Sequence, residues 1–253
     1  MNRFGRGRPR YWASLSKVTM RLLLFDIDGT LINSSRIGRA ALGRALLDVF
    51  GTTGALDTYE FAGKTDRRIV RDLMVEAGWD DETIAARMAE LDERMAAAGR
   101  DLFTPQAIWA CPGVPELLEA LGRRNDVMLA LLTGNIRHTV PLKLSAAGID
   151  PAAFSGGAYG SDSLERDDLF AIALERVRQS TGIAFAGKDV TIIGDTPADI
   201  RCARHGGGRA IAVATGPYPA QLLGRHSPDH LFHDLVHTDE VLRALLEPVT
   251  TPA

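Results

Sequence analysis

Short apolar runs alternate with helix-like segments over much of the chain. Five runs are predicted as strands, because each is short, mainly aliphatic and closed by polar or glycine-containing turns. They are Arg21–Ile27, Val127–Leu132, Ala153–Tyr159, Val190–Ile193 and Ala210–Val213, the third being weakened by Gly156 and Gly157. Near-continuous apolar runs of this length are typical of parallel strands that are buried on both faces of a sheet.

Helical patterns lie between these runs. Pro197, for example, suits the first turn of a helix, and the glycines after His205 suit its end. The alternation of strands and helices predicts an α/β fold with a doubly wound, Rossmann-like parallel sheet. The predicted helices are Val114–Arg124, Thr139–Ala147, Asp167–Ser180 and Pro197–His205.

Residues 34–110 break this alternation, because they contain only helical patterns. Three helices are predicted there, with glycines as stops: Ser35–Phe50 before Gly51, Asp66–Ala77 before Gly78, and Asp81–Ala98 before Gly99. An all-α insert directly after the first strand is expected to form a cap over an active site at the edge of the sheet. The predicted division is a core of residues 20–33 and 111–248 and a cap of residues 34–110.

The composition is that of an ordinary globular protein, with 253 residues, 45% hydrophobic and 24% charged. Cys111 and Cys202 lie far apart without a CxxC spacing, which favours buried thiols in a reducing cytoplasm over a zinc site. The net charge of −3 argues against nucleic-acid binding. No apolar run approaches the ~20 residues of a membrane span.

Residues 1–19 differ from the rest in charge. They contain five basic residues and no acidic one: Arg3, Arg6, Arg8, Arg10 and Lys17. We interpret this leader as a disordered extension, or as sequence upstream of a true start at Met20, because a strand begins directly after that residue. An anion-binding tail is the alternative, and salt-sensitive binding that disappears without the leader would indicate it.

Side chains suited to catalysis or metal binding follow four of the predicted strands. Because the carboxyl ends of parallel strands meet at one edge of the sheet, these side chains are expected to converge there. Buried acids are costly without a partner, and an oxygen-rich ligand set favours Mg²⁺. The residues are Asp26 and Asp28, Thr133 and Asn135, Arg166, and Asp195 and Asp199.

Three motifs resemble those of the haloacid dehalogenase (HAD) superfamily. They are Asp26-Ile27-Asp28-Gly29-Thr30, Leu132-Thr133-Gly134-Asn135 and Gly194-Asp195-Thr196-Pro197-Ala198-Asp199. Their order and their positions at strand ends also match, over about residues 20–245. The helical insert resembles the C1 cap of phosphoglycolate phosphatase-like members.

The resemblance implies a role for each acidic residue. Asp26 is the implied nucleophile, which attacks phosphorus to give an aspartyl-phosphate. Asp28 is implied to protonate the leaving oxygen and later to accept a proton from water. The implied Mg²⁺ ligands are the Asp26 carboxylate, the Asp28 backbone carbonyl and Asp195, with Asp199 as a nearby acid.

The resemblance also implies groups that bind the substrate. Thr133 and the backbone N–H groups near Gly134, with Asn135, are implied to hold phosphate oxygens, while Arg166 balances the negative charge. Arg166 departs from the family, which usually has lysine there, and a guanidinium differs from a point charge. A surface position for Arg166 near a helix start is the alternative.

Ordinary structural explanations exist for the other motifs. Asp195 and Asp199 suit the capping of a helix that begins at Pro197. The pair Asp28-Gly29 suits a turn, and Thr133-Gly134-Asn135 a polar loop. Their coincidence at successive strand ends favours the catalytic interpretation.

The substrate is indicated less clearly. A small cap favours a small phosphorylated metabolite. In the loop between cap helices, Lys64 or Arg67 is a candidate partner for a substrate carboxylate such as that of phosphoglycolate, whereas Thr65 or Asp66 suits a helix start. Four histidines are expected at the surface: His226, His230, His233 and His237.

The sequence therefore predicts a Mg²⁺-dependent phosphatase of the cytoplasm, monomeric or homodimeric, without nucleic-acid or membrane partners. A β-phosphoglucomutase-like phosphotransferase shares every core residue and stays open, as do pyrophosphate and nucleotides as substrates. Asp28 disfavours a dehalogenase or a phosphonatase. A catalytically silent binding protein finds support only in the altered position Arg166.

Overall fold

A computed structural model describes residues 20–247; the basic leader and the last residues, 248–253, lie outside the described part. The main sheet has the strand order β5-β4-β1-β6-β7-β8, and each neighbouring pair is parallel. This arrangement confirms the predicted α/β fold. The strands are β1 (Arg21–Phe25), β4 (Val127–Leu132), β5 (Gly157–Ala158), β6 (Val190–Gly194), β7 (Arg209–Val213) and β8 (His230–Phe232).

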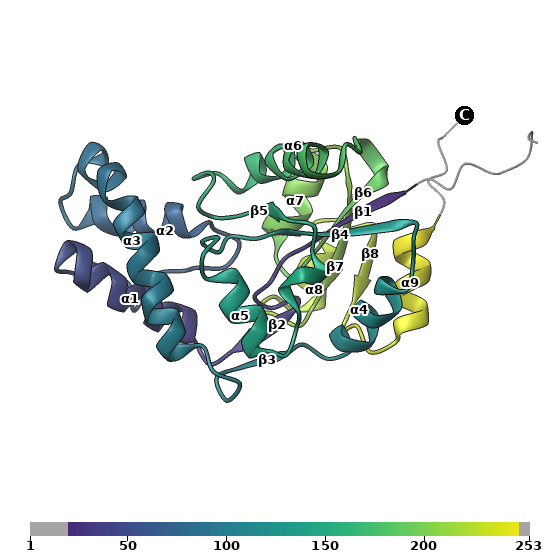
Figure 1. Ribbon diagram of the computed structural model, residues 1–253, viewed down its shortest axis with the longest axis horizontal. Helices are drawn as coiled ribbons and strands as arrows, with labels where there is room; N and C mark the ends of the chain where they lie inside the picture. Colours follow the sequence, from purple (N-terminus) through teal and green to yellow (C-terminus); the bar gives the residue numbers. More distant parts are fainter. Residues whose placement is uncertain (1–19, 248–253) are drawn as a thin grey trace, which may run out of the picture.

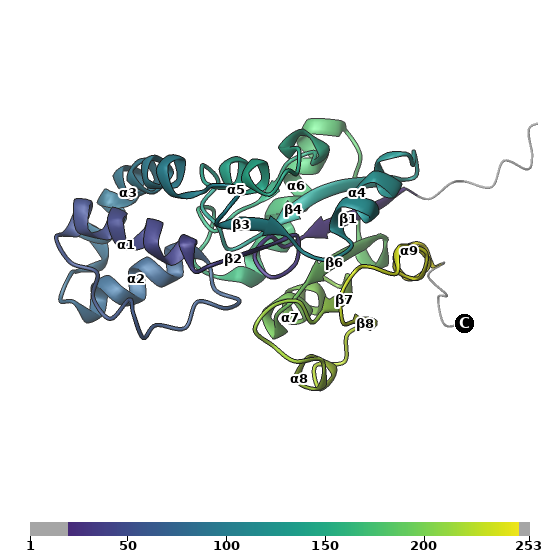
Figure 2. The same ribbon diagram turned by 90° about the horizontal axis from the view of Figure 1, so that it is seen from below.

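Helices cover both faces of the sheet (Figures 1 and 2). In β1, Leu22 and Leu24 pack into one apolar cluster, and Leu23 and Phe25 into another. The first cluster contains residues of α6 (Leu169–Thr181), α7 (Pro197–His205) and α8 (Ala220–Gly224). The second contains residues of α4 (Val114–Gly122), α5 (Val140–Ala146) and α9 (Thr238–Leu246). The alternating side chains of β1 thus join the two helical layers.

The sequence prediction of the sheet needs two corrections. First, the sequence does not predict β8, α8 or α9, because the C-terminal part of the chain contains few apolar runs. Leu231 of β8 is itself exposed. Second, β5 is confined to two residues of the predicted Ala153–Tyr159. Residues Pro151–Ala153 form a 3₁₀ turn, and Gly156 has a φ of 108°.

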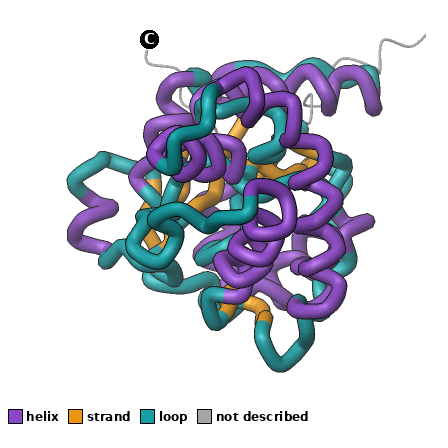
Figure 3. The backbone as a smooth tube through the Cα atoms, turned by 90° about the vertical axis from the view of Figure 1, so that its left-hand side faces the viewer, coloured by secondary structure: helices purple, strands orange, loops and turns teal. Residues whose placement is uncertain are grey.

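The helices α1 (Ile37–Phe50), α2 (Asp66–Glu76) and α3 (Asp81–Leu102) share an apolar cluster separate from the two on the sheet. They lie together at one end of the molecule, away from α9 (Figure 1). Viewed from that end, they stand in front of the strands (Figure 3).

The segment predicted to be all-helical also contains β structure at its ends. β2 (Ile32–Ser34) and β3 (Ile108–Ala110) form an antiparallel two-stranded ribbon where the chain enters and leaves the helical segment. Each strand is too short to show the period-2 alternation that identifies a strand. The strictly all-α description of residues 34–110 is therefore wrong.

The predicted helix stop at Gly99 is also wrong, since α3 continues to Leu102. A Cβ at Gly99 would lie 2.8 Å from a ring carbon of Phe103, so a larger residue there would force this ring to shift. Gly51 does end α1, as its left-handed C-cap with a φ of 72°. Between Met20 and Glu247, no helix combines the length and apolarity that crossing a membrane requires.

Candidate active site

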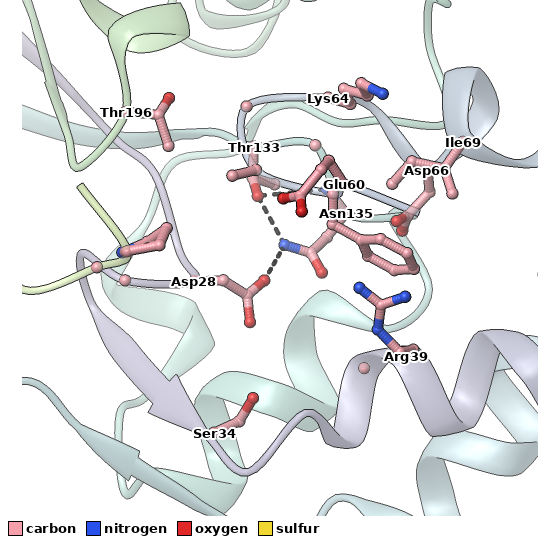
Figure 4. Close-up of a pocket in the computed structure, with 18 of the residues that line it drawn as sticks. Asp28, Ser34, Arg39, Glu60, Lys64, Asp66, Ile69, Thr133, Asn135 and Thr196 are labelled. Atoms are coloured by element: carbon pink, nitrogen blue, oxygen red, sulfur yellow. Dashed lines mark hydrogen bonds between the residues drawn. The ribbon is translucent and has the colours of Figure 1, made fainter. Parts of the chain in front are cut away.

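The carboxyl ends of β1, β4 and β6 meet at a pocket with a volume of about 810 Å³. Asp26 follows β1, Thr133 follows β4 and Asp195 follows β6, and all three line the pocket. The opposite lining comes from α1 and the segment up to the start of α2, including Arg39, Glu60 and Lys64, which are labelled around the pocket in Figure 4. The pocket thus lies between the sheet edge and the helical segment.

Asp26 is buried against a guanidinium. Its Oδ2 lies 3.2 Å from Nη2 of Arg166, and the side chains are 8% and 4% exposed. Burial raises the pKa of Asp26 to about 6, against the opposing effect of Arg166. A carboxylate in this setting is poorly hydrated and stays available for attack on an electrophile.

Arg166 joins two acids. Besides Asp26, its Nη2 contacts Oδ1 of Asp199 at 2.5 Å. Burial alone would lower the pKa of the guanidinium, but Asp199 and Asp26 hold it above its ordinary value. The alternative of a surface position is therefore wrong, and the 3₁₀ turn Arg166–Asp168 directs this side chain inward.

Asp195 is the most enclosed acid of the site. Its Oδ1 accepts a hydrogen bond of 3.3 Å from Thr30, whereas its buried Oδ2 has no partner among the described residues. A Cβ at Gly29, where φ is 83°, would lie 2.3 Å from that Oδ2, so only glycine fits this turn. Burial, followed by Asp26 and Asp199, raises the pKa of Asp195 well above its ordinary value.

Asp199 has partners for both carboxylate oxygens. Oδ2 accepts hydrogen bonds from the backbone N–H and the hydroxyl of Thr196 at 3.0 and 2.7 Å, and Oδ1 contacts Arg166. Thr196 and Asp199 form a capping box at the start of α7. Asp199 therefore caps this helix, as the structural explanation predicts, while it also fixes Arg166 beside Asp26.

Carboxylate oxygens of Asp26, Asp195 and Asp199 approach within 4.8 Å of one another. Three acids and one guanidinium leave an excess of negative charge in a buried space. The buried Oδ2 of Asp195, which has no partner among the described residues, would be stabilised by a cation. A hard cation such as Mg²⁺ takes oxygen ligands of this kind. The donor set therefore fits Mg²⁺.

The second motif forms a hydrogen-bonded chain with Asp28. Nδ2 of Asn135 donates to Oδ2 of Asp28 at 2.6 Å and to the hydroxyl of Thr133 at 2.8 Å (Figure 4). Thr133 and Asn135 are buried, but the Asp28 side chain is 42% exposed. Asp28 is therefore the acid of this group that is open to the pocket.

Sequence reasoning missed Lys143, which contacts Asp28 from α5. A signal was present, because Lys143 stands three residues after Val140 and next to Leu144, both on the buried face of the helix. Lysine at such a position is unusual unless it is paired with another group. Thr30 was quoted in the first motif but received no role.

The two candidate specificity residues, Lys64 and Arg67, differ in their position relative to the pocket. Lys64 lines the pocket and holds its Nζ 3.9 Å from the centre of the Tyr59 ring. Arg67 does not line it. Thr65 caps α2 by accepting from the Arg68 N–H, so the alternative of a helix start also holds.

Asp66, at the start of α2, forms hydrogen bonds with backbone groups of the second motif and of the residue that follows it. The Asp66 N–H donates to the carbonyl of Gly134 at 2.7 Å, and the Asp66 carboxylate accepts from the Ile136 N–H at 2.8 Å. A Cβ at Gly134 would lie 2.1 Å from the carbonyl oxygen of Lys64. Burial raises the pKa of Asp66 to about 6. The two sides of the pocket therefore meet closely at this point.

The four C-terminal histidines lie away from the pocket. Three are exposed, and His230, in β8, is half-buried with Nε2 3.0 Å from Glu247. No histidine is among the residues that line the pocket in the described part of the chain.

Comparison with known proteins gives a consistent result. Residues 23–204 match the family described as haloacid dehalogenase-like hydrolase. The chain is 27% identical over 240 residues to phosphoglycolate phosphatase from Pseudomonas putida, covering 92% of this chain and 81% of the relative. It is 24% identical to pyrophosphatase PpaX from Oceanobacillus iheyensis, covering 86% of this chain and 94% of the relative. A solved hydrolase from Pseudomonas syringae superposes with a TM-score of 0.65 at 25% identity, covering 88% of this chain and 99% of that one.

Proposed function

The chain belongs to the haloacid dehalogenase-like hydrolase family, and from this premise we propose that it is a Mg²⁺-dependent phosphatase of a small phosphorylated metabolite, acting through an aspartyl-phosphate. The observation that carries the proposal is the buried group of Asp26, Asp195 and Arg166 at the strand ends. A nucleophilic carboxylate, an acid with one oxygen left for a metal ion and a fixed cation are the parts that phosphoryl transfer to a side chain requires.

Asp26 attacks phosphorus, and the bond from phosphorus to the leaving oxygen breaks. Asp28 donates a proton to that oxygen; its exposure to the pocket supports this role. Water then attacks the phosphorus of the aspartyl-phosphate, Asp28 accepts a proton from this water, and the Asp26 carboxylate is released with inorganic phosphate.

Asp26, the Asp28 backbone carbonyl and Asp195 would hold Mg²⁺, with Asp199 close by. When bound, the ion supplies positive charge that reduces the repulsion between a carboxylate and a phosphate dianion. Arg166 keeps the Asp26 carboxylate oriented, and the Thr133 hydroxyl, the Gly134 backbone and Asn135 bind phosphate oxygens.

Residues 34–110 act as a cap that encloses the leaving group, and residues 20–33 and 111–248 form the catalytic core. The separate apolar cluster of α1–α3 supports this division. Relatives named phosphoglycolate phosphatase support a small phosphorylated acid as substrate, and Lys64, which lines the pocket on the cap side, would pair with its carboxylate. The relative named pyrophosphatase makes pyrophosphate the second compound to test.

The test is phosphate release from an aryl phosphate, with and without Mg²⁺, by the wild type and Asp26→Asn. Mg²⁺-dependent release that is lost in the variant supports the proposal, and phosphoglycolate and pyrophosphate then identify the substrate. Wild-type protein that releases no phosphate from any of these compounds in Mg²⁺ would contradict it.

A further inference from the structure

Lys143 is a buried cation that the reaction above does not use. Its side chain is 4% exposed, and it belongs to α5, outside the three motifs. Its Nζ lies 2.9 and 2.7 Å from the two carboxylate oxygens of Asp28, and 2.5 Å from Oδ1 of Asn135. An ammonium has three donors, and these three contacts use all of them.

We propose that Lys143 is a positioning residue, which holds the Asp28 carboxylate where it exchanges a proton with the leaving oxygen. The inference rests on the proposed function, because Asp28 is the acid and base of that reaction. It assigns a second cation to the site, distinct from Arg166, which contacts the nucleophile Asp26.

The contacts form a closed network around one open carboxylate. Lys143 donates to Asp28 and Asn135, Asn135 donates to Asp28, and Asn135 also donates to Thr133. Lys143, Asn135 and Thr133 are all buried, whereas the Asp28 side chain is 42% exposed. An open side chain has rotational freedom, and bonds to buried partners remove it.

The helical segment fixes Lys143 from the other side. A Cβ at Gly38, in α1, would lie 3.3 Å from Nζ, and the Phe103 ring, which follows α3, has its centre 5.8 Å from it. The space for the ammonium is therefore closed by residues next to or within the helical segment. Because the same ammonium holds Asp28, we expect the position of this carboxylate to respond to how these residues pack against α5.

The main test is Lys143→Met, which keeps an unbranched side chain, one atom shorter, and removes its charge. A phosphate ester of an alcohol needs a proton on the leaving oxygen, but 4-nitrophenyl phosphate has a leaving group that departs without one. We expect kcat/KM for phosphoglycolate to fall about 100-fold and that for 4-nitrophenyl phosphate to fall less than about 5-fold. Asp28→Asn should give the same pattern, and the double variant should lose no more than Asp28→Asn alone.

Two further variants separate positioning from folding. Lys188→Met removes a lysine that donates to the carbonyl of Gly208, away from the pocket, and should leave both kcat/KM values unchanged. Gly38→Ala places a methyl group beside Nζ while it favours the helix. We expect it to lower kcat/KM for phosphoglycolate about 5-fold more than for the aryl ester, with an unchanged melting temperature.

Equal losses for the two esters in Lys143→Met, or no loss, would overturn the inference. A crystal structure of Lys143→Met gives a readout without activity: Asp28 should leave its position, and an unmoved carboxylate would show that Asn135 alone suffices. Failure of the proposed function is distinguishable, because the wild type itself would then release no phosphate in Mg²⁺.

Discussion

The pocket has two walls that are built in different ways. The core wall consists of Asp26, Thr133, Arg166 and Asp195, which are all buried and follow strands of the sheet. The opposite wall, named the cap wall after the proposed cap, consists of half-buried residues on α1 and the loop before α2, such as Arg39 and Lys64. The first wall is held by ion pairs in a buried setting, and the second by cation–π and carbonyl contacts at a more open surface.

Arg39 illustrates how the cap wall is held. Its guanidinium donates to the carbonyl oxygens of Leu56 and Tyr59 and lies 4.1 Å from the centre of the Phe61 ring. These contacts shape the loop without placing an unpaired charge in a buried space. Under the proposed function, the core wall would carry the chemistry, where misplaced charge is costly, and the cap wall would be free to vary with the substrate.

The largest effect is expected from Arg166→Ala in the core wall. The change removes the partner of two buried acids, so we expect kcat to fall about 1,000-fold and the free energy of unfolding to fall by about 3–5 kcal/mol. Steady-state phosphate release and chemical denaturation measure the two losses. Arg166→Lys keeps the charge without the planar guanidinium and should lose less of both. Near-wild-type activity of Arg166→Ala would remove this residue from the site.

The two walls should also differ in how their acids respond to pH and Mg²⁺. Burial raises the pKa of Asp26 to about 6 and that of Asp195 well above its ordinary value, on the core wall. A carboxyl with a higher pKa in the folded state binds more protons when folded, so stability decreases as the pH rises through that range. Without metal, we expect the free energy of unfolding to fall by about 1–3 kcal/mol between about pH 4.5 and pH 7.5.

Mg²⁺ should remove the core-wall part of this decrease, because it binds the ionised carboxylates of the folded state. Burial also raises the pKa of Asp66 to about 6, but this residue lies beside the second motif and not in the acid cluster. Its smaller contribution to the decrease in the free energy of unfolding should therefore persist in Mg²⁺ and vanish in Asp66→Asn. Denaturation curves at several pH values, with and without Mg²⁺, measure both contributions to the free energy of unfolding. The same pH slope in both conditions would contradict a metal site on the core wall.

The sequence predicts the core wall better than the cap wall, for a physical reason. Asp26, Thr133 and Asp195 each follow an apolar run, and parallel strands bring their carboxyl ends together whatever the details of packing. The sequence leaves open whether Arg166 lies in the site or at the surface, because the turn that directs it inward has no apolar pattern of its own. Its burial depends on Asp26 and Asp199, which come from distant parts of the chain.

Features that depend on tertiary contacts escaped prediction. The ribbon of β2 and β3 is formed by two segments of three residues that stabilise each other across the whole helical insert. Lys143 carried a local signal, a lysine on a buried helix face, but its partner Asp28 lies on another element. Gly99 has the sequence signature of a helix end, and only the packing of Phe103 explains a glycine inside the helix.

The smallest effect is expected from Lys64→Ala in the cap wall, and it tests the comparison most directly. Lys64 is half-buried and contacts the Tyr59 ring, so its loss should change little of the fold and nothing of the core wall. We expect kcat/KM for phosphoglycolate to fall about 5-fold, because a single solvent-accessible ion pair contributes about 1 kcal/mol, while kcat/KM for an aryl phosphate stays within about 2-fold. Arg67→Ala is the matched control, since that neighbouring cation does not line the pocket. If Lys64→Ala lowers the values for both esters equally, the cap wall takes part in the chemistry and the two walls are not separate in function.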